Sequence, residues 1–207
     1  MARTYARCAS YVDEGVVSRN LGSADDAWID DKFFATAFER PGRFRFLYRD
    51  RYPWAQSWKR SLIWRNNGPT RAFRSYAPPD REGPDVEEFA RAIAGFTGVS
   101  AGSAHTVPRM LLPTEVTGWC ITELEDVVLN EEALDDVGPC FRVRGFHPRT
   151  GDGIALYIQP DTMLLRRLTE DTKPDGSGGA TTTYTPSINV DVTQLFSVKP
   201  ESLLIDD

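Results

Sequence analysis

The stretch Phe34–Tyr48, which reads FATAFERPGRFRFLY, holds the strongest pattern in the chain. Two strand-like runs flank a short break at Arg40-Pro41-Gly42. After the break Phe44, Phe46 and Tyr48 occupy alternate positions. A period of two directs these three aromatic side chains to one face of a sheet. They form a broad apolar surface, which either protein or ligand must cover.

The composition is that of a single globular domain. The chain has 207 residues, of which 41% are hydrophobic and 26% are charged. A net charge of −6 makes a nucleic-acid partner unexpected, because phosphate binding needs a basic excess. The sequence contains no run of eighteen apolar residues, so it predicts no membrane-spanning helix. The first ten residues lack the apolar core of a signal peptide. The expectation is either a cytoplasmic protein or one whose targeting segment is absent from this chain.

Period-two patterns predict strands on both sides of a helical insert. Before the insert, strands are expected over Tyr11–Arg19, Trp28–Glu39, Arg43–Arg49, Arg60–Arg65 and Arg71–Tyr76, with a short helix over Thr4–Ser10. After it, strands are expected over Ile121–Asn130, Cys140–Phe146, Ile154–Gln159, Met163–Glu170 and Thr181–Val192. The order lacks β-α-β alternation, so a parallel sheet is not expected. The predicted class is α+β, with a large curved antiparallel sheet, or incomplete β-barrel, under a short helical lid.

The helical insert spans about residues 85–112 of this single domain over residues 1–207. Asp85 as N-cap and Glu88 three positions later form a capping-box pattern. The apolar stripe that follows consists of Phe89, Ala92, Ile93 and Phe96. A small-residue linker over Ser100–Ala104 leads to a second short helix over Thr106–Leu112, with Pro108 in its first turn.

The pattern F-x-x-x-F-x-R-P-G-R-F-R-F-x-Y in Phe34–Tyr48 resembles the LolA-like outer-membrane lipoprotein carriers of bacteria. In that family an incomplete antiparallel barrel surrounds a hydrophobic cavity, and helices close it as a lid. The family's arginine-proline step matches Arg40-Pro41, and later elements are similar to Leu62–Gly68 and Phe196–Pro200. The chain is most similar to an uncharacterised, lipoprotein-sorting-like branch. The stretch Ala94–Pro113 departs from the carriers and leaves the cargo open.

This resemblance implies a non-enzymatic protein without a cofactor, placed in the periplasm or cell envelope. Its partner would be a hydrophobic ligand (a lipid or acyl chain) or a lipoprotein, with a membrane-associated protein as a further partner, and the chain would be a monomer. Arg40 would hold the lid through hydrogen bonds to its backbone, since guanidinium offers five donors. The expected cavity lining is Phe34, Phe38, Phe44, Phe46, Tyr48 and Trp64 from the sheet, with Phe89, Ile93, Phe96, Met110 and Leu111 from the lid.

Two other functions stay open. The same side chains could fill a dry core, which predicts an envelope module that binds proteins by its surface. Alternatively, Gly98–Gly102 matches G-x-S-x-G, and Ser100, Asp126 and His147 follow the chain order of an α/β-hydrolase triad. That motif requires a strand before the serine and a parallel sheet, whereas a helical stripe precedes Ser100 here.

The remaining reactive residues predict no metal site. The three cysteines include no C-x-x-C pair, and there are only two histidines, His105 and His147. Cys120 and Cys140 could pair in an oxidising compartment or remain buried thiols. The acidic run is interpreted as solvated surface; it consists of Glu123, Glu125, Asp126, Glu131, Glu132, Asp135 and Asp136.

Overall fold

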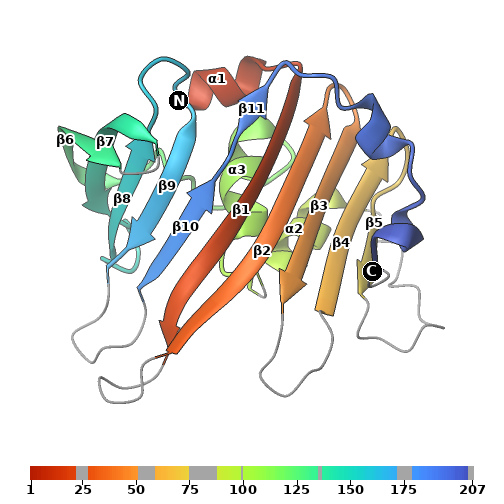
Figure 1. The fold of residues 1–207 in the computed structure, drawn as a ribbon, viewed down its shortest axis with the longest axis horizontal. Coiled ribbons are helices and arrows are strands. Elements are labelled where there is room, and N and C mark those ends of the chain that lie inside the picture. The colour runs from red at the N-terminus through yellow and green to blue at the C-terminus, as the bar shows by residue number, and fades with distance from the viewer. Residues whose placement is uncertain are drawn as a thin grey trace.

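The structure is a computed structural model that describes residues 1–21, 28–50, 59–74, 88–98, 100–134, 137–171 and 179–204. Its centre is one large antiparallel sheet whose strand order is β5-β4-β3-β2-β1-β10-β9-β8-β7-β6, with β11 also paired to β1 (Figure 1). The sheet is therefore two meanders joined at β1 and β10, and its two end strands, β5 and β6, do not pair with each other. This open antiparallel sheet confirms the predicted fold class.

The strands of the first meander are β1 (Ser10–Leu21), β2 (Trp28–Glu39), β3 (Arg43–Asp50), β4 (Lys59–Asn66) and β5 (Arg71–Arg74). Those of the second are β6 (Glu125–Leu134), β7 (Gly138–Phe146), β8 (Gly153–Ile158), β9 (Leu165–Glu170) and β10 (Ala180–Tyr184). The short strand β11 (Ser187–Ile188) follows β10 in the chain and pairs with β1. The helices are α1 (Ala2–Arg7), α2 (Phe89–Thr97) and α3 (Ser103–Leu111), followed by the 3-10 helices η1 (Thr193–Phe196) and η2 (Pro200–Leu204).

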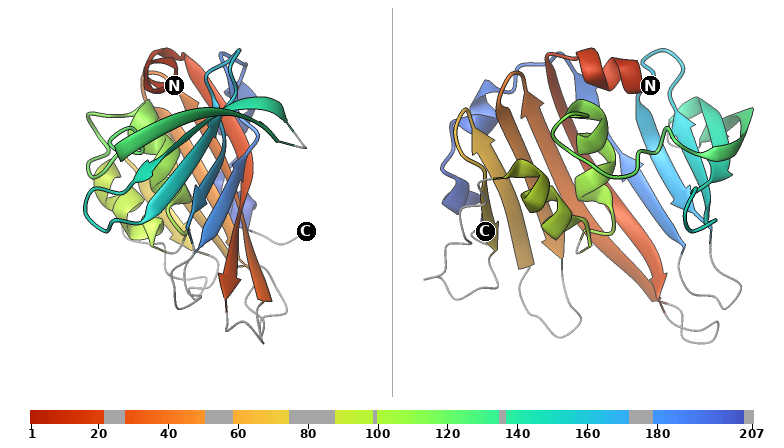
Figure 2. Two further views of the ribbon diagram at one scale, coloured as in Figure 1. Left: turned by 90° about the vertical axis from the view of Figure 1, so that its left-hand side faces the viewer. Right: turned by 180° about the vertical axis from the view of Figure 1, so that it is seen from behind.

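Helices α2 and α3, here called the lid, lie across one face of the sheet, which we call the inner face (Figure 2). Alternation along β3 buries Phe44, Phe46 and Tyr48 on this face, as the sequence predicts. The opposite, outer face carries a smaller apolar cluster. In it Trp64 of β4 packs against Phe196 of η1, with ring centroids 5.6 Å apart.

Two of the strands predicted after the helical insert have different bounds in the structure. The strand expected from Ile121 begins only at Glu125, because Ile121 is buried in the turn before it. The strand expected over Thr181–Val192 is split into β10 and β11, with Pro186 in the break, where it need not donate to the ladder. The C-terminal segment buries Phe196, but Val198 is exposed.

The helical insert also differs from its prediction. Glu88 is itself the N-cap of α2, so the capping box was wrong, and Asp85 lies outside the described residues. The predicted linker is a tight turn in which Ala101 and Gly102 have positive φ. Helix α3 already begins at Ser103, which places Pro108 inside it. None of the described helices is long and apolar enough to cross a membrane.

Candidate functional site

The candidate site is the apolar interface between the inner face of the sheet and the lid. Of the eleven side chains predicted to line it, ten belong to one buried cluster: Phe34, Phe38, Phe44, Phe46 and Tyr48 from the sheet, and Phe89, Ile93, Phe96, Met110 and Leu111 from the lid. One contact that joins the layers is between the rings of Phe44 and Phe89, which meet edge to face with centroids 4.9 Å apart. Each of the ten is at most 6% exposed. The two layers therefore pack against each other.

Trp64 is the exception, because its side chain lies on the outer face. The inner-face position of β4 belongs to Ile63, which pairs with Phe46 of β3. Trp64 instead pairs in register with Arg45 and contacts the C-terminal segment. The prediction that Trp64 faces the lid was wrong.

Arg40 connects two helices at one end of the sheet. Its guanidinium donates to four backbone carbonyls: Cys8 O at 2.9 Å, Ala6 O at 2.7 Å, Tyr5 O at 3.4 Å and Leu111 O at 3.0 Å. Three of these belong to the C-terminal end of α1 and one to the last residue of α3. Such carbonyls lack partners within their own helix and carry its negative dipole end, so a cation is favourable there.

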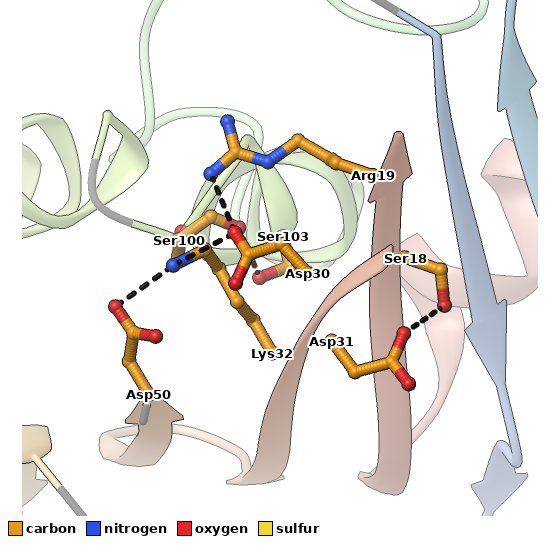
Figure 3. A network of polar contacts seen from close by, with 8 residues as sticks. All are labelled: Ser18, Arg19, Asp30, Asp31, Lys32, Asp50, Ser100 and Ser103. Atoms are coloured by element: carbon orange, nitrogen blue, oxygen red, sulfur yellow. Dashed lines mark hydrogen bonds and ion pairs between the residues drawn. The ribbon is translucent and has the colours of Figure 1, made fainter. Parts of the chain in front are cut away.

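A buried ionic cluster, which the sequence analysis missed, lies at the opposite end of the inner face (Figure 3). The ammonium of Lys32 is 2.8 Å from Asp50 Oδ2 and 3.3 Å from Asp30 Oδ2. Arg19 approaches Asp30 at 3.7 Å. Asp30, Lys32 and Asp50 are all buried, so these charges compensate one another away from water. The signal was present in the sequence, because Asp30 and Lys32 alternate in phase with Phe34.

Asp13 is a third buried carboxyl on the inner face, apart from the ionic cluster. It accepts hydrogen bonds from the Tyr11 hydroxyl at 2.5 Å and from the Thr36 backbone N–H at 3.0 Å. Burial raises the pKa of Asp13 to about 6, and these two hydrogen bonds only partly oppose that rise. Burial also raises the pKa values of the neighbouring Tyr11 and Tyr184 hydroxyls.

We expect Asp13 to make the protein less stable as the pH rises from about 4 to about 6. In this window the folded state holds the Asp13 proton and the unfolded state has lost it, so the free energy of unfolding falls with pH. The total loss is up to about 3 kcal/mol. Urea unfolding at several pH values should show this slope in the wild type and a flatter curve in Asp13→Asn, while Glu14→Gln on the neighbouring residue keeps it. Equal slopes in wild type and Asp13→Asn would contradict the assignment.

The predicted hydrolase triad is not supported. Ser100 is fully buried, and its Oγ accepts a hydrogen bond from the Ala104 N–H at 3.0 Å, so it stabilises the start of α3. His147 Nδ1 accepts from the backbone N–H groups of Arg149 and Thr150 in the turn after β7. Asp126 is exposed on the end strand β6. These partners are local and structural.

Other predicted reactive residues have ordinary roles. All three cysteines are buried thiols, so no disulfide joins Cys120 to Cys140. His105 Nε2 lies 3.0 Å from the carbonyl of Thr117. Among the described residues, no group of three His, Cys, Asp or Glu side chains is arranged to hold a metal ion. The described members of the acidic run are exposed, whereas Asp135 and Asp136 lie outside the described residues.

Two hollows of about 450 and 630 Å³ lie on the outer face, not beneath the lid. They adjoin each other over β1, β2 and β3, and both are lined by Glu14, Ala35, Arg45 and Thr185. The guanidinium of Arg45 donates to Leu195 O at 3.3 Å, which holds the C-terminal segment along one of them.

Comparison with known proteins gives matches of structure. No protein-family model matches the chain, and no curated protein does. A crystal structure of MucB matches with a TM-score of 0.51 at 12% identity, over 96% of this chain and 62% of that one. An uncharacterized conserved protein from Thermus thermophilus matches with a TM-score of 0.46 at 10% identity, over 98% of this chain and 94% of that one. A LolA superfamily protein from Nitrosomonas europaea matches with a TM-score of 0.35 at 9% identity, over 94% of this chain and 96% of that one.

These likenesses concern the fold alone, at identities of 9–12%. The open antiparallel sheet with helices on one face is the architecture that the resemblance in Phe34–Tyr48 implies, and the MucB structure shares this fold. The chain spans less than two thirds of the MucB chain that it matches, at 62%.

Proposed function

We propose that this protein is a non-enzymatic binding protein of the cell envelope that takes an apolar ligand (a lipid, an acyl chain or the lipid moiety of a lipoprotein) between the inner face of the sheet and the lid. The observation that carries the proposal is the contact of Arg40 with the backbones of both α1 and α3. Arg40, at the end of β2, thereby ties α1 and the sheet to α3 of the lid. These elements must separate for a ligand to enter.

The chemistry of the interface suits such a ligand. The inner face and the lid offer a continuous apolar surface rich in phenylalanine. Separating the layers exposes this surface to water, at a cost of about 25 cal/mol for each Å². A hydrocarbon chain that replaces the lid contacts recovers most of that cost. The closed structure is then the ligand-free state, and ligand binding shifts the lid toward an open state.

Replacing Arg40 by leucine should loosen the lid. The substitution removes four hydrogen bonds from the guanidinium to backbone carbonyls. A buried hydrogen bond to a charged group contributes about 1.5–3 kcal/mol to stability. Each of these contributes less, because Arg40 is exposed to solvent. We expect faster amide hydrogen exchange in α1 and α3 and at least threefold faster uptake of a dansyl-labelled fatty acid. Arg40→Lys should act in the same direction, because a single ammonium lacks the guanidinium's fork of donors.

Arg43→Leu is the matched control. Arg43 follows the same turn, but its guanidinium contacts Glu39 at 2.8 Å and lies over the Phe196 ring. This substitution should leave exchange in the lid and fatty-acid uptake unchanged. Equal uptake and equal exchange in wild type and Arg40→Leu would contradict a role for Arg40 as a lid latch.

The second candidate is a protein-binding envelope module with a filled core. The near-complete burial of the ten inner side chains favours it, because side chains that pack closely against one another leave little room between them for a ligand. Native mass spectrometry on protein purified without detergent, followed by organic extraction, separates the two candidates. A bound acyl or isoprenoid species near one-to-one supports the carrier, whereas a ligand-free mass together with no fatty-acid uptake supports the filled core.

A further inference from the structure

The two edge strands of the sheet, β5 and β6, differ in length and in how far other parts of the protein cover them. At one end, β5 is only four residues long, and η2 packs beside β4 and β5. Arg60 of β4 also donates to Leu203 O of η2 at 3.5 Å. At the other end, β6 is ten residues long, and every residue but the last is exposed. A long end strand leaves a row of backbone N–H and C=O groups able to pair with another strand.

The exposed strand is unusually apolar. Val127, Val128 and Leu129 are 54%, 55% and 63% exposed, and Phe146 of the adjoining β7 is 43% exposed. Register places Leu129 beside Val143 on the inner face and Val128 beside Arg144 on the outer face. An incoming strand would therefore find apolar side chains on both faces of the sheet.

The charge of β6 is all of one sign. Its sequence EDVVLNEEAL holds four acidic residues and no lysine or arginine. Glu132 is engaged with Arg142 of β7 at 3.0 Å, while Glu125 and Glu131 are exposed to solvent. An adjoining strand with lysine or arginine beside these carboxylates would gain opposite-charge cross-strand pairs.

The same charges disfavour a second copy of this chain as the occupant. Two β6 strands related by a two-fold axis would pair antiparallel, which sets acidic residues opposite acidic residues in registers near the middle of the strand. A pairing centred on Glu131, the middle of the regularly paired part Val128–Leu134, for example, sets Glu131 opposite its own copy. Like charges directly opposite are destabilising.

We infer that β6 is a docking edge that adds an extended segment of a different protein, in which lysine or arginine residues alternate with β-branched apolar ones. Backbone hydrogen bonds to β6 supply affinity, and the apolar and charged neighbours supply specificity. Strands β1, β10, β9, β8 and β7 lie between β6 and β2, the strand that Arg40 follows (Figure 1), so this surface does not depend on the lid proposal.

A synthetic peptide, acetyl-KVKIRVKV-amide, tests the inference, with a version N-methylated at alternate amides as its control. We expect the first peptide to bind, with an affinity that falls as salt rises, and to slow amide hydrogen exchange within residues 125–134. The N-methylated peptide keeps the charge but cannot complete the ladder, so its affinity should be at least tenfold weaker.

Substitutions in the protein complete the test. Val128→Lys/Leu129→Lys adds two positive charges to exposed positions and should weaken peptide binding at least tenfold without changing the melting temperature appreciably. Ile29→Lys, at an equally exposed apolar residue of β2, should not weaken it beyond the small effect of one added charge. The inference is overturned if both peptides bind alike, if protection appears outside β6, or if the protein self-associates with β6 protected.

Discussion

Replacing Lys32 by methionine should lower the free energy of unfolding by about 3–5 kcal/mol, because removing one partner of a buried ion pair leaves uncompensated charge in the interior. Methionine fills a similar volume, so lost packing adds little. The Lys32 ammonium is 2.8 Å from Asp50 and 3.3 Å from Asp30, which Arg19 also approaches at 3.7 Å. Among the described residues, the Oδ1 atom of Asp50 is buried without a hydrogen-bond partner, so the Lys32 ammonium is the described cation that compensates this carboxylate. Urea unfolding at neutral pH measures the effect.

A compensated variant distinguishes this electrostatic cause from simple damage to the core. In Lys32→Met/Asp30→Asn/Asp50→Asn the buried site has no net charge from these three residues, and most of the lost stability should return. As a surface control, Arg91→Met breaks an exposed pair with Glu88 and should change stability by less than about 0.5 kcal/mol. A triple variant no more stable than Lys32→Met would show that packing, not charge, explains the loss.

The ionic cluster also bears on how the lid is positioned on the sheet. The cluster (Figure 3) lies at one end of the inner face and Arg40 at the other, so polar contacts bound the apolar interface at both ends. Ser100, in the turn that joins α2 to α3, and Ser103, the first residue of α3, are both buried. Apolar contacts are non-directional, so these polar groups are the ones suited to set the position of the lid on the sheet.

Alternation predicted the inner face well wherever one face of a strand is covered by the core and the other is not. In β3, Phe44 and Phe46 alternate with arginines, and their placement is confirmed. In β4 the same reasoning failed, because Leu62, Ile63 and Trp64 are all buried. The lid covers one face of this strand and the C-terminal segment covers the other. A continuous apolar run therefore carries no information about which residue faces the lid.

The polar part of the site was less predictable, because it depends on contacts between distant segments. Arg40 was identified through the family resemblance, and its acceptors are carbonyls of residues 32–71 positions away. Asp50 lies 18 residues from Lys32 and reaches it only because β2 and β3 pair in one register. Backbone acceptors and strand register leave little trace in a single sequence.

Gly15→Ala should destabilise the protein by about 3 kcal/mol, because the added methyl group has no room. An alanine Cβ would lie 2.2 Å from the Cζ atom of Phe34 and 2.3 Å from the carbonyl oxygen of Thr183. The Phe34 ring is held by Phe46 and Tyr184, with centroids 6.1 and 5.5 Å away, so it cannot move without disturbing the inner face. Glycine in a strand often marks such a close approach.

The loss of stability in Gly15→Ala should be concentrated where β1 pairs with β10. Gly15 pairs with Tyr184 of β10, and β1 with β10 is the junction between the two meanders of the sheet. Hydrogen exchange in Gly15→Ala should therefore accelerate first in β1 and β10. Gly95→Ala is the matched control, because Gly95 lies in α2 with no atom within 4 Å of an added Cβ. Alanine is the better helix former, so this change should raise stability by up to about 1 kcal/mol. If Gly15→Ala unfolds at the same urea concentration as the wild type, the Phe34 ring does not lie over Gly15 in solution.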